Sequence, residues 1–187
     1  FGPGGYYKRG DGADMLIDEN QALGEASGSN SGVVVLGKGG RITLEMSTPF
    51  ADTPGADLAV LENGLTGPDG TLFAELAYVE VSSDGLTFAR FPVEDRKSEP
   101  VGGYDTTFGY VDPARYSGFA GVHPVGVGTA FDLNKLKDDP NVISRTVDLT
   151  EIRYVRIIDV IGDGRDEDAS GRAIYDPYPT VNPNAKG

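Results

Sequence analysis

The sequence predicts an all-β protein, built as an antiparallel sandwich or barrel with long loops and one or two short helical turns. Three observations favour this class: an alternating stretch at 75–92 with an Asp-Gly turn, an apolar stretch at 152–161, and 27 Gly and 12 Pro in 187 residues. Gly and Pro at this frequency disfavour long helices, whereas short strands joined by turns tolerate them. We expect one domain over 1–187, with 1–18 as an extended arm, because a chain of this length can bury a substantial core.

The stretch 75–92 is the clearest β-hairpin in the sequence. Its first strand places three apolar residues on one face, namely Ala77, Val79 and Val81. Asp84 and Gly85 follow, and Asp-Gly between alternating apolar runs is among the strongest hairpin signals. Phe88 and Phe91 add aromatic bulk to the return strand. We therefore expect this hairpin to organise the sheet, with Glu75 at its rim.

The segments before this hairpin predict one helical turn and three strands. Asp18 can cap a turn that Gly24 ends. Two apolar runs, 33–36 and 41–46, flank a glycine-rich turn and predict a second hairpin. The short run 57–61 is predicted as a strand buried on both faces, which places the residues that follow it at a sheet rim.

The segments after the hairpin predict a long loop and two more strands. Residues 93–128 are rich in Gly, Pro and Tyr and show little periodicity, so we expect a loop that carries a helical turn capped by Asp112. A further helical turn is expected after Ala130. Strands are predicted at 145–149 and at 152–161, the latter apolar on both faces and therefore central in its sheet. An acidic loop follows at 162–168.

The composition excludes several classes of partner. A net charge of -13 disfavours nucleic acid and anionic lipid, which basic surfaces bind. There is no Cys and no apolar run long enough to cross a bilayer, so we expect neither disulfides nor membrane insertion. The chain begins at Phe1, and we expect an exported protein whose signal peptide has been removed.

Carboxylates suggest calcium, because hard cations prefer oxygen ligands. Four of them fall within ten residues around the acidic loop and form our first choice for a metal site: Asp159, Asp163, Asp166 and Asp168. The alternative is a solvated acidic turn. Residues at strand ends or in loops form the second choice: Glu62, Asn63, Glu75 and Asp132. The alternative there is that the glutamates cap turns or pair with Arg.

Aromatic residues concentrate in the long loop and are candidates for stacking on sugar rings. With the single histidine they form the predicted ligand-binding set: Tyr104, Phe108, Tyr110, Tyr116 and His123. The alternative is that the rings, with Phe119, cover the core. His123 alone cannot build a two-histidine metal centre, and no nucleophile motif accompanies it. We therefore expect no catalytic residues and no enzyme activity.

Two stretches carry a resemblance to known folds. Val-Glu-Val-Ser-Ser-Asp-Gly-Leu-Thr-Phe at 79–88, followed by Arg-Tyr-Val-Arg-Ile at 153–157, resembles the galactose-binding-like jelly rolls, which include discoidin domains and many carbohydrate-binding modules. More of the chain is similar to a family of bacterial exported cell surface proteins, over 22–24, 35–40, 57–64, 73–92, 123–133, 158–162 and 176–180. The resemblance implies an exported jelly-roll β-sandwich.

The chain departs from that family at its end. A further strand is expected shortly after 176–180, but the sequence stops at Gly187. Either that strand has been removed, or it is present but was not identified, or another chain supplies it.

Two functions follow as expectations. The first is a calcium-stabilised extracellular or cell-surface binding module, with a glycan as the ligand, or another surface protein as the partner. The alternative is a self-associating structural subunit of an extracellular assembly or filament, completed by a strand or arm of a neighbouring chain.

Overall fold

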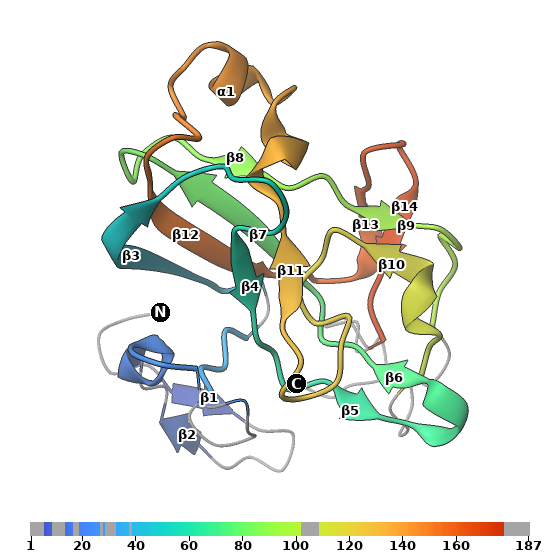
Figure 1. Cartoon of the computed structure of the whole chain (residues 1–187). Coiled ribbons are helices and arrows are strands. Elements are labelled where there is room, and N and C mark those ends of the chain that lie inside the picture. The colour runs from blue at the N-terminus through green and yellow to red at the C-terminus, as the bar shows by residue number, and fades with distance from the viewer. Residues whose placement is uncertain are drawn as a thin grey trace.

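The computed structural model describes residues 6–8, 14–16, 19–26, 28, 33–37, 39–101 and 109–177 (Figure 1). The protein is mostly β, with antiparallel strands and a few short helical turns, as predicted. Its largest sheet has four strands in the order β3 (Arg41–Phe50), β12 (Ile152–Asp159), β7 (Ala77–Ser82) and β8 (Ala89–Arg90). All neighbouring strands in this sheet are antiparallel.

The predicted hairpin is confirmed as β7 and β8, which pair through Val81 and Ala89. Asp84 shapes the connection, because its Oδ1 accepts hydrogen bonds from the amides of Leu86 and Thr87, both at 2.8 Å. Gly85 has a φ of +74°, which a glycine adopts without steric penalty. The Asp-Gly pair therefore predicts this turn because Asp84 accepts hydrogen bonds from the turn's amides and Gly85 takes its positive φ.

Strand β7 is buried on both faces and separates two hydrophobic cores. Ala77, Val79 and Val81 face the first core, and Tyr78 faces the second. Glu80, on the same face as Tyr78, is also buried and forms ion pairs with Arg90 and Arg156 on the neighbouring strands. The charge is tolerated there because opposite charges from both sides compensate its desolvation.

The first core lies between the large sheet and a second, two-stranded sheet. In that sheet β4 (Leu58–Val60) pairs with β11 (Thr129–Phe131). The 3₁₀ turn η4 (Leu133–Leu136) follows β11 at once and contributes two fully buried leucines. The helix α1 (Pro140–Ile143) comes next along the chain.

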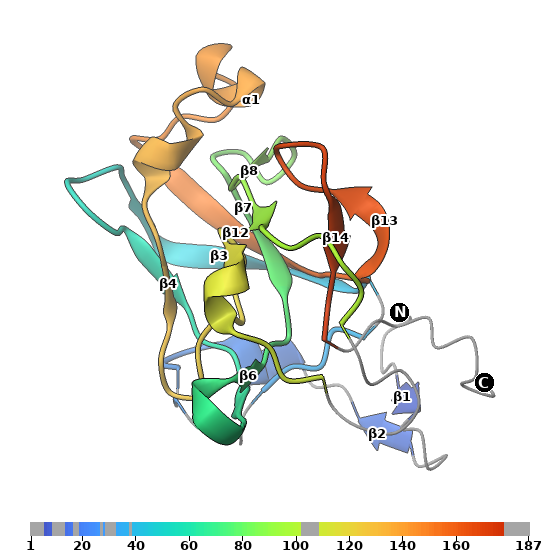
Figure 2. The same ribbon diagram turned by 90° about the vertical axis from the view of Figure 1, so that its right-hand side faces the viewer.

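The second core lies among short strand pairs. These are β5 (Leu65–Thr66) with β6 (Leu72–Phe73), β9 (Glu94–Asp95) with β10 (Tyr116–Ser117), and β13 (Asp163–Glu167) with β14 (Ala173–Tyr175). Phe119 and Ile174 are fully buried at its centre. Figure 2 shows β4 and the β13–β14 pair on opposite sides of β7.

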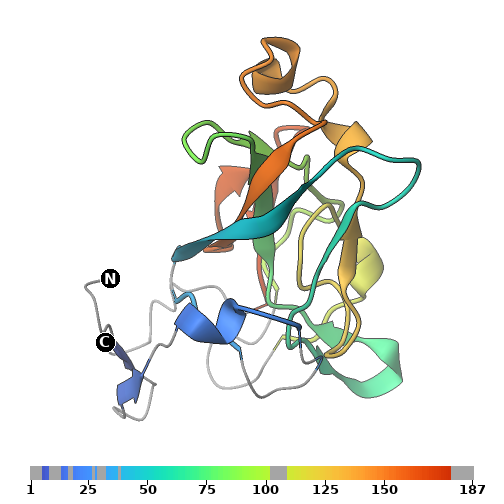
Figure 3. The ribbon, with the colours of Figure 1, turned by 60° about the vertical axis from the view of Figure 1, so that its left-hand side comes forward.

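The remaining elements are helical turns and one N-terminal strand pair. Strand β1 (Tyr6–Lys8) pairs with β2 (Asp14–Leu16) within the predicted arm. The 3₁₀ turn η1 (Glu19–Ala22) confirms the helical turn expected before Gly24, and in Figure 3 it lies beneath β3. Its proposed cap, Asp18, lies outside the described residues. A further turn, η2 (Pro68–Gly70), was not predicted.

Two further helical turns occur where they were predicted, and an aspartate caps each; the cap at Asp112 was predicted, whereas the cap at Asp132 was not. Asp112 accepts a hydrogen bond from the amide of Ala114 at the start of η3 (Pro113–Arg115), and Asp132 accepts one from the amide of Asn134 at the start of η4. No helix among the described residues has the length and hydrophobicity that crossing a membrane requires.

Two predicted strands are wrong. Residues 33–36 form no strand in the structure, so β3 has no hairpin partner there. Residues 145–149 form a loop, because the amides of Thr146 and Val147 both donate to the carbonyl of Asn141 at 2.9 Å, which closes the chain onto the end of α1. Val147 is buried nonetheless, so this apolar side chain anchors the loop in the first core.

Three other expectations need correction. The strand expected at 57–61 is not buried on both faces, since Ala59 is exposed. The acidic loop 162–168 is largely strand β13, which pairs with β14. The long loop 93–128 contains β9 and β10, which are held by a buried ion pair between Asp95 and Arg115, with Nε and Oδ1 2.7 Å apart.

Candidate functional site

Three aspartates from two loops meet at one point on the surface. The antiparallel pairing of β4 with β11 places Leu58 opposite Phe131, so the residue before β4 lies beside the residue after β11. These residues are Asp57 and Asp132, and the amide of Asp57 donates to the carbonyl of Phe131 at 2.9 Å. Asp52, in the loop between β3 and β4, completes the group. Carboxylate oxygens of the three lie within 4.8 Å of one another.

Asp57 is fixed by its neighbours. Its Oδ1 accepts hydrogen bonds from the amide and the hydroxyl of Thr53, at 2.9 and 2.7 Å, and its Oδ2 accepts one from the amide of Leu133 at 2.9 Å. Burial raises the pKa of Asp57, but these hydrogen bonds outweigh it and lower the pKa below its usual value. Asp57 is therefore a carboxylate at neutral pH.

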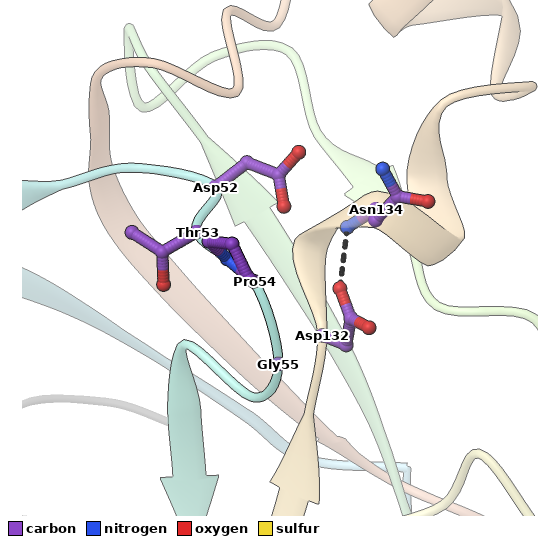
Figure 4. A pocket seen from close by; sticks show the side chains of 6 residues that line it. All are labelled: Asp52, Thr53, Pro54, Gly55, Asp132 and Asn134. Carbon is purple, nitrogen blue, oxygen red and sulfur yellow. Dashed lines mark hydrogen bonds between the residues drawn. The ribbon is translucent and has the colours of Figure 1, made fainter.

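The other two aspartates have carboxylate oxygens that accept no hydrogen bond from the described residues. Asp132 uses Oδ1 to cap η4 through the amide of Asn134, at 2.9 Å. The carboxylate of Asp52 forms no hydrogen bond or ion pair within the described part of the chain. A pocket of about 340 Å³ lies here, lined on one side by Asp132 and Asn134 and on the other by the loop residues Asp52, Thr53, Pro54 and Gly55 (Figure 4).

This geometry suits a divalent cation. Ligand oxygens lie about 2.4 Å from a calcium ion, so oxygens on opposite sides of it are about 4.8 Å apart. In the described part of the chain no Lys or Arg forms an ion pair with any of the three aspartates, so their negative charge is not neutralised by the protein. The triad can therefore bind a metal ion.

A second acidic cluster lies at the other end of the large sheet. It contains Glu62 after β4, Glu75 before β7, and Asp159 at the end of β12. Burial, followed by the negative charge of Glu75, raises the pKa of Glu62 to about 8, against the hydrogen bond from the amide of Asn63. Burial raises the pKa of Asp159 to about 6, although the amide of Gly39 donates to its Oδ2 at 2.8 Å. Burial and the charge of Asp159 also raise the pKa of Glu75.

This cluster makes stability depend on pH. Because the folded pKa of Glu62 lies above its unfolded value, the folded protein holds this proton more tightly between about pH 4.5 and pH 8. The free energy of unfolding is therefore expected to fall as the pH rises through this window. Glu62→Gln, which cannot ionise, is expected to flatten the decrease and to stabilise the protein at pH 8 in urea denaturation.

Glu167→Gln is the matched control, because Glu167 is an exposed glutamate on β13. It is expected to keep the pH dependence of the parent protein. An equal slope for the parent and for Glu62→Gln between pH 5 and pH 8 would contradict the assignment to Glu62.

The first predicted metal set is not brought together. Asp159 belongs to the second acidic cluster, whereas Asp163 and Asp166 lie along β13 and Asp168 at its end. Asp168 is buried, and its oxygens accept hydrogen bonds from the amides of Asp95, Ser170 and Arg172 and from the Arg172 side chain. An extended strand separates neighbouring carboxylates, whereas a loop folded around an ion would gather them.

The second predicted set is divided between the two clusters. Glu62 and Glu75 lie together as expected from their rim positions, whereas Asp132 lies in the aspartate triad. The backbone amide of Asn63 donates a hydrogen bond to Glu62 Oε2 at 2.8 Å. The partners of Asp132, Asp52 and Asp57, were not predicted. They flank Thr53-Pro54-Gly55, and this turn sequence between two aspartates was the available signal.

The predicted ligand-binding residues lie in different surroundings. Tyr104 and Phe108 lie outside the described residues. Tyr116 is buried, and its hydroxyl donates to the carbonyl of Tyr175 at 2.7 Å, so its ring lies in the second core. Tyr110 is exposed and packs edge-on against Phe73, and His123 is exposed.

Comparison of this chain with protein-family models, curated proteins and solved structures gave no match.

Proposed function

We propose that this chain is a non-enzymatic binding module stabilised by calcium at Asp52, Asp57 and Asp132. The observation that supports the proposal is the convergence of three carboxylates from two loops. An ion bound there would tie the loop before β4 to the turn after β11, and so would hold the second sheet over the first core. Calcium is the cation we choose, because the donors are all oxygen atoms in an open pocket at the surface.

The wider proposal rests on the sequence. The resemblance of 79–88 and 153–157 implies a jelly-roll sandwich, and the wider similarity to bacterial cell surface proteins implies export to the cell surface. A carbohydrate is the ligand class that this resemblance favours, and exposed Tyr110 is the aromatic side chain that supports it. A glycan array probed in calcium and in EGTA tests the ligand class, and no binding in either condition would contradict it.

Calcium is expected to raise the melting temperature, and Asp52→Asn is expected to abolish that increase. Asp52 is the residue of choice because its carboxylate holds no other group of the described structure in place, so the variant should melt like the parent in EGTA. By linkage, calcium at 100 times its dissociation constant would add about 2.7 kcal/mol to the free energy of unfolding. Melting curves and calorimetric titration measure both effects.

Asp138→Asn is the matched control, since Asp138 is an exposed aspartate after η4 and outside the triad. It is expected to respond to calcium like the parent. A parent protein whose melting temperature is the same in calcium and in EGTA would overturn the calcium site.

A further inference from the structure

The outer edge of β3 is a long strand edge with no partner in the described part of the chain. β3 is the last strand in the order of the large sheet and pairs with β12 along one side only. It spans ten residues, and Figures 1 and 3 show it at the border of the sheet. The segment 33–36, which was expected to pair with this strand as a hairpin, forms no strand. An uncovered edge of this length presents backbone amides and carbonyls that another strand can pair with.

The charges along this edge are self-complementary. Arg41 and Glu45 are exposed and lie on the same face of β3, because they are four residues apart. Arg41 forms no ion pair with any described residue. The described contact of the Glu45 carboxylate is a long hydrogen bond from the hydroxyl of Tyr154, at 3.4 Å. Both charges are therefore available to a partner strand.

We propose that two copies of this chain pair along β3, antiparallel, with Thr43 of each copy at the two-fold axis. In this register Arg41 of each copy faces Glu45 of the other, so two ion pairs form across the junction. Thr43 of one copy faces Thr43 of the other, and a Thr–Thr pair is a favourable cross-strand pair in antiparallel sheets. The two four-stranded sheets would then join into one continuous sheet.

The same register is favourable on the opposite face of β3. Ile42 and Leu44 are half-buried there, and each would face the other residue type in the second copy. They are paired within the sheet with Ile157 and Val155, so the junction would extend an apolar face that already packs on the first core. Pairing thus covers apolar side chains that the single chain leaves partly exposed.

The charges also select against the neighbouring registers. A two-fold axis at Glu45 would place the two Glu45 side chains opposite each other, and an axis at Arg41 would oppose the two arginines. Like charges directly opposite are destabilising. Of the registers with the axis at residue 41, 43 or 45, the one centred on Thr43 alone satisfies both charges. This inference goes beyond the proposed function and does not depend on calcium, so it is tested in both calcium and EGTA.

Charge variants test the register. Arg41→Glu leaves two negative residues on the edge and Glu45→Arg leaves two positive ones, so each is expected to weaken self-association about tenfold or more in sedimentation velocity. An equimolar mixture of the two variants is expected to restore the dimer, and the double variant Arg41→Glu/Glu45→Arg is expected to restore it as well. Circular dichroism checks that each variant is folded.

Cross-linking tests the axis independently. Thr43→Cys places the two sulfurs at the axis, where opposite Cα atoms about 5 Å apart permit a disulfide. The parent chain has no Cys, so the cross-link is specific. Ser47→Cys, on the same exposed strand but away from the axis, is the control: it is expected to pair like the parent but to form no disulfide between the two copies under oxidation. A parent protein that is monomeric up to millimolar concentration, or equal cross-linking at both positions, would overturn the proposal.

Discussion

Replacing Arg115 with methionine is expected to lower the free energy of unfolding by about 3 to 5 kcal/mol. Arg115 and Asp95 are both buried, and the guanidinium donates to both carboxylate oxygens at 2.7 Å. The variant leaves Asp95 as an unpaired charge in the protein interior. Urea denaturation measures the change.

The effect is expected to be large because Asp95 links strand β9 to strand β14 and to the turn η3. Its oxygens also accept hydrogen bonds from the amides of Lys97, Ser98 and Tyr175, which join β9 to the chain after it and to β14. Burial raises the pKa of Asp95, but the hydrogen bonds from Arg115 and from the amides of Ser98 and Tyr175 lower it below the usual value. Loss of the arginine therefore removes the main compensation for a buried charge.

Arg153→Met is the matched control. Arg153 pairs with Glu151 at the surface, where the side chains are 46% and 53% exposed. Exposed ion pairs contribute about 0 to 1 kcal/mol, so this variant should unfold close to the parent. Similar losses of unfolding free energy in the two variants would show that burial of the Asp95–Arg115 ion pair does not account for its contribution to stability.

Gly121→Ala is expected to destabilise the protein by roughly 2 to 5 kcal/mol, from a left-handed backbone and from overpacking together. Gly121 has a φ of +83°, and a Cβ at this position would lie 1.9 Å from the carbonyl oxygen of Glu75. The chain cannot easily withdraw, because Ala120 and Ala77 exchange two backbone hydrogen bonds at 2.9 and 3.2 Å. Urea or thermal unfolding measures the loss.

Gly171→Ala separates the two causes. Gly171 has a similar φ of +75°, but nothing lies within 4 Å of the position of its Cβ. Its variant carries the conformational penalty without the clash and is expected to lose about 1 to 2 kcal/mol. Equal losses at the two glycines would show that the contact with Glu75 adds nothing.

Local signals in the sequence predict the elements whose hydrogen bonds close nearby. Asp84 and Asp112 accept hydrogen bonds from amides two or three residues later in the chain. The turn after β7 and the cap of η3 can therefore be predicted from a short stretch of sequence. Strand β12 could be predicted because its apolar residues fall on both faces, as suits a strand that lies between β3 and β7. The apolar residues of 145–149 led to a wrong strand prediction, because Val147 is buried without being part of a sheet.

The candidate site is less predictable, because its residues meet only in the folded chain. Asp132 was expected at a metal site, but its partners lie about 75 to 80 residues earlier and are placed by the pairing of β4 with β11. Glu62 and Asp159 likewise interact only in the folded chain, because they follow or end strands that are far apart in the sequence. Proximity in sequence favoured the carboxylates of 159–168 instead, and the strand conformation of β13 keeps those apart.

The burial of β7 on both faces also limits how this protein can vary. In a strand with one solvent-facing side, every second residue can be substituted with little loss of stability. In β7, by contrast, all six residues are buried. A change at Val79 disturbs the first core, and a change at Tyr78 disturbs the second. We therefore expect the slowest drift among homologues in this strand, because none of its side chains faces solvent.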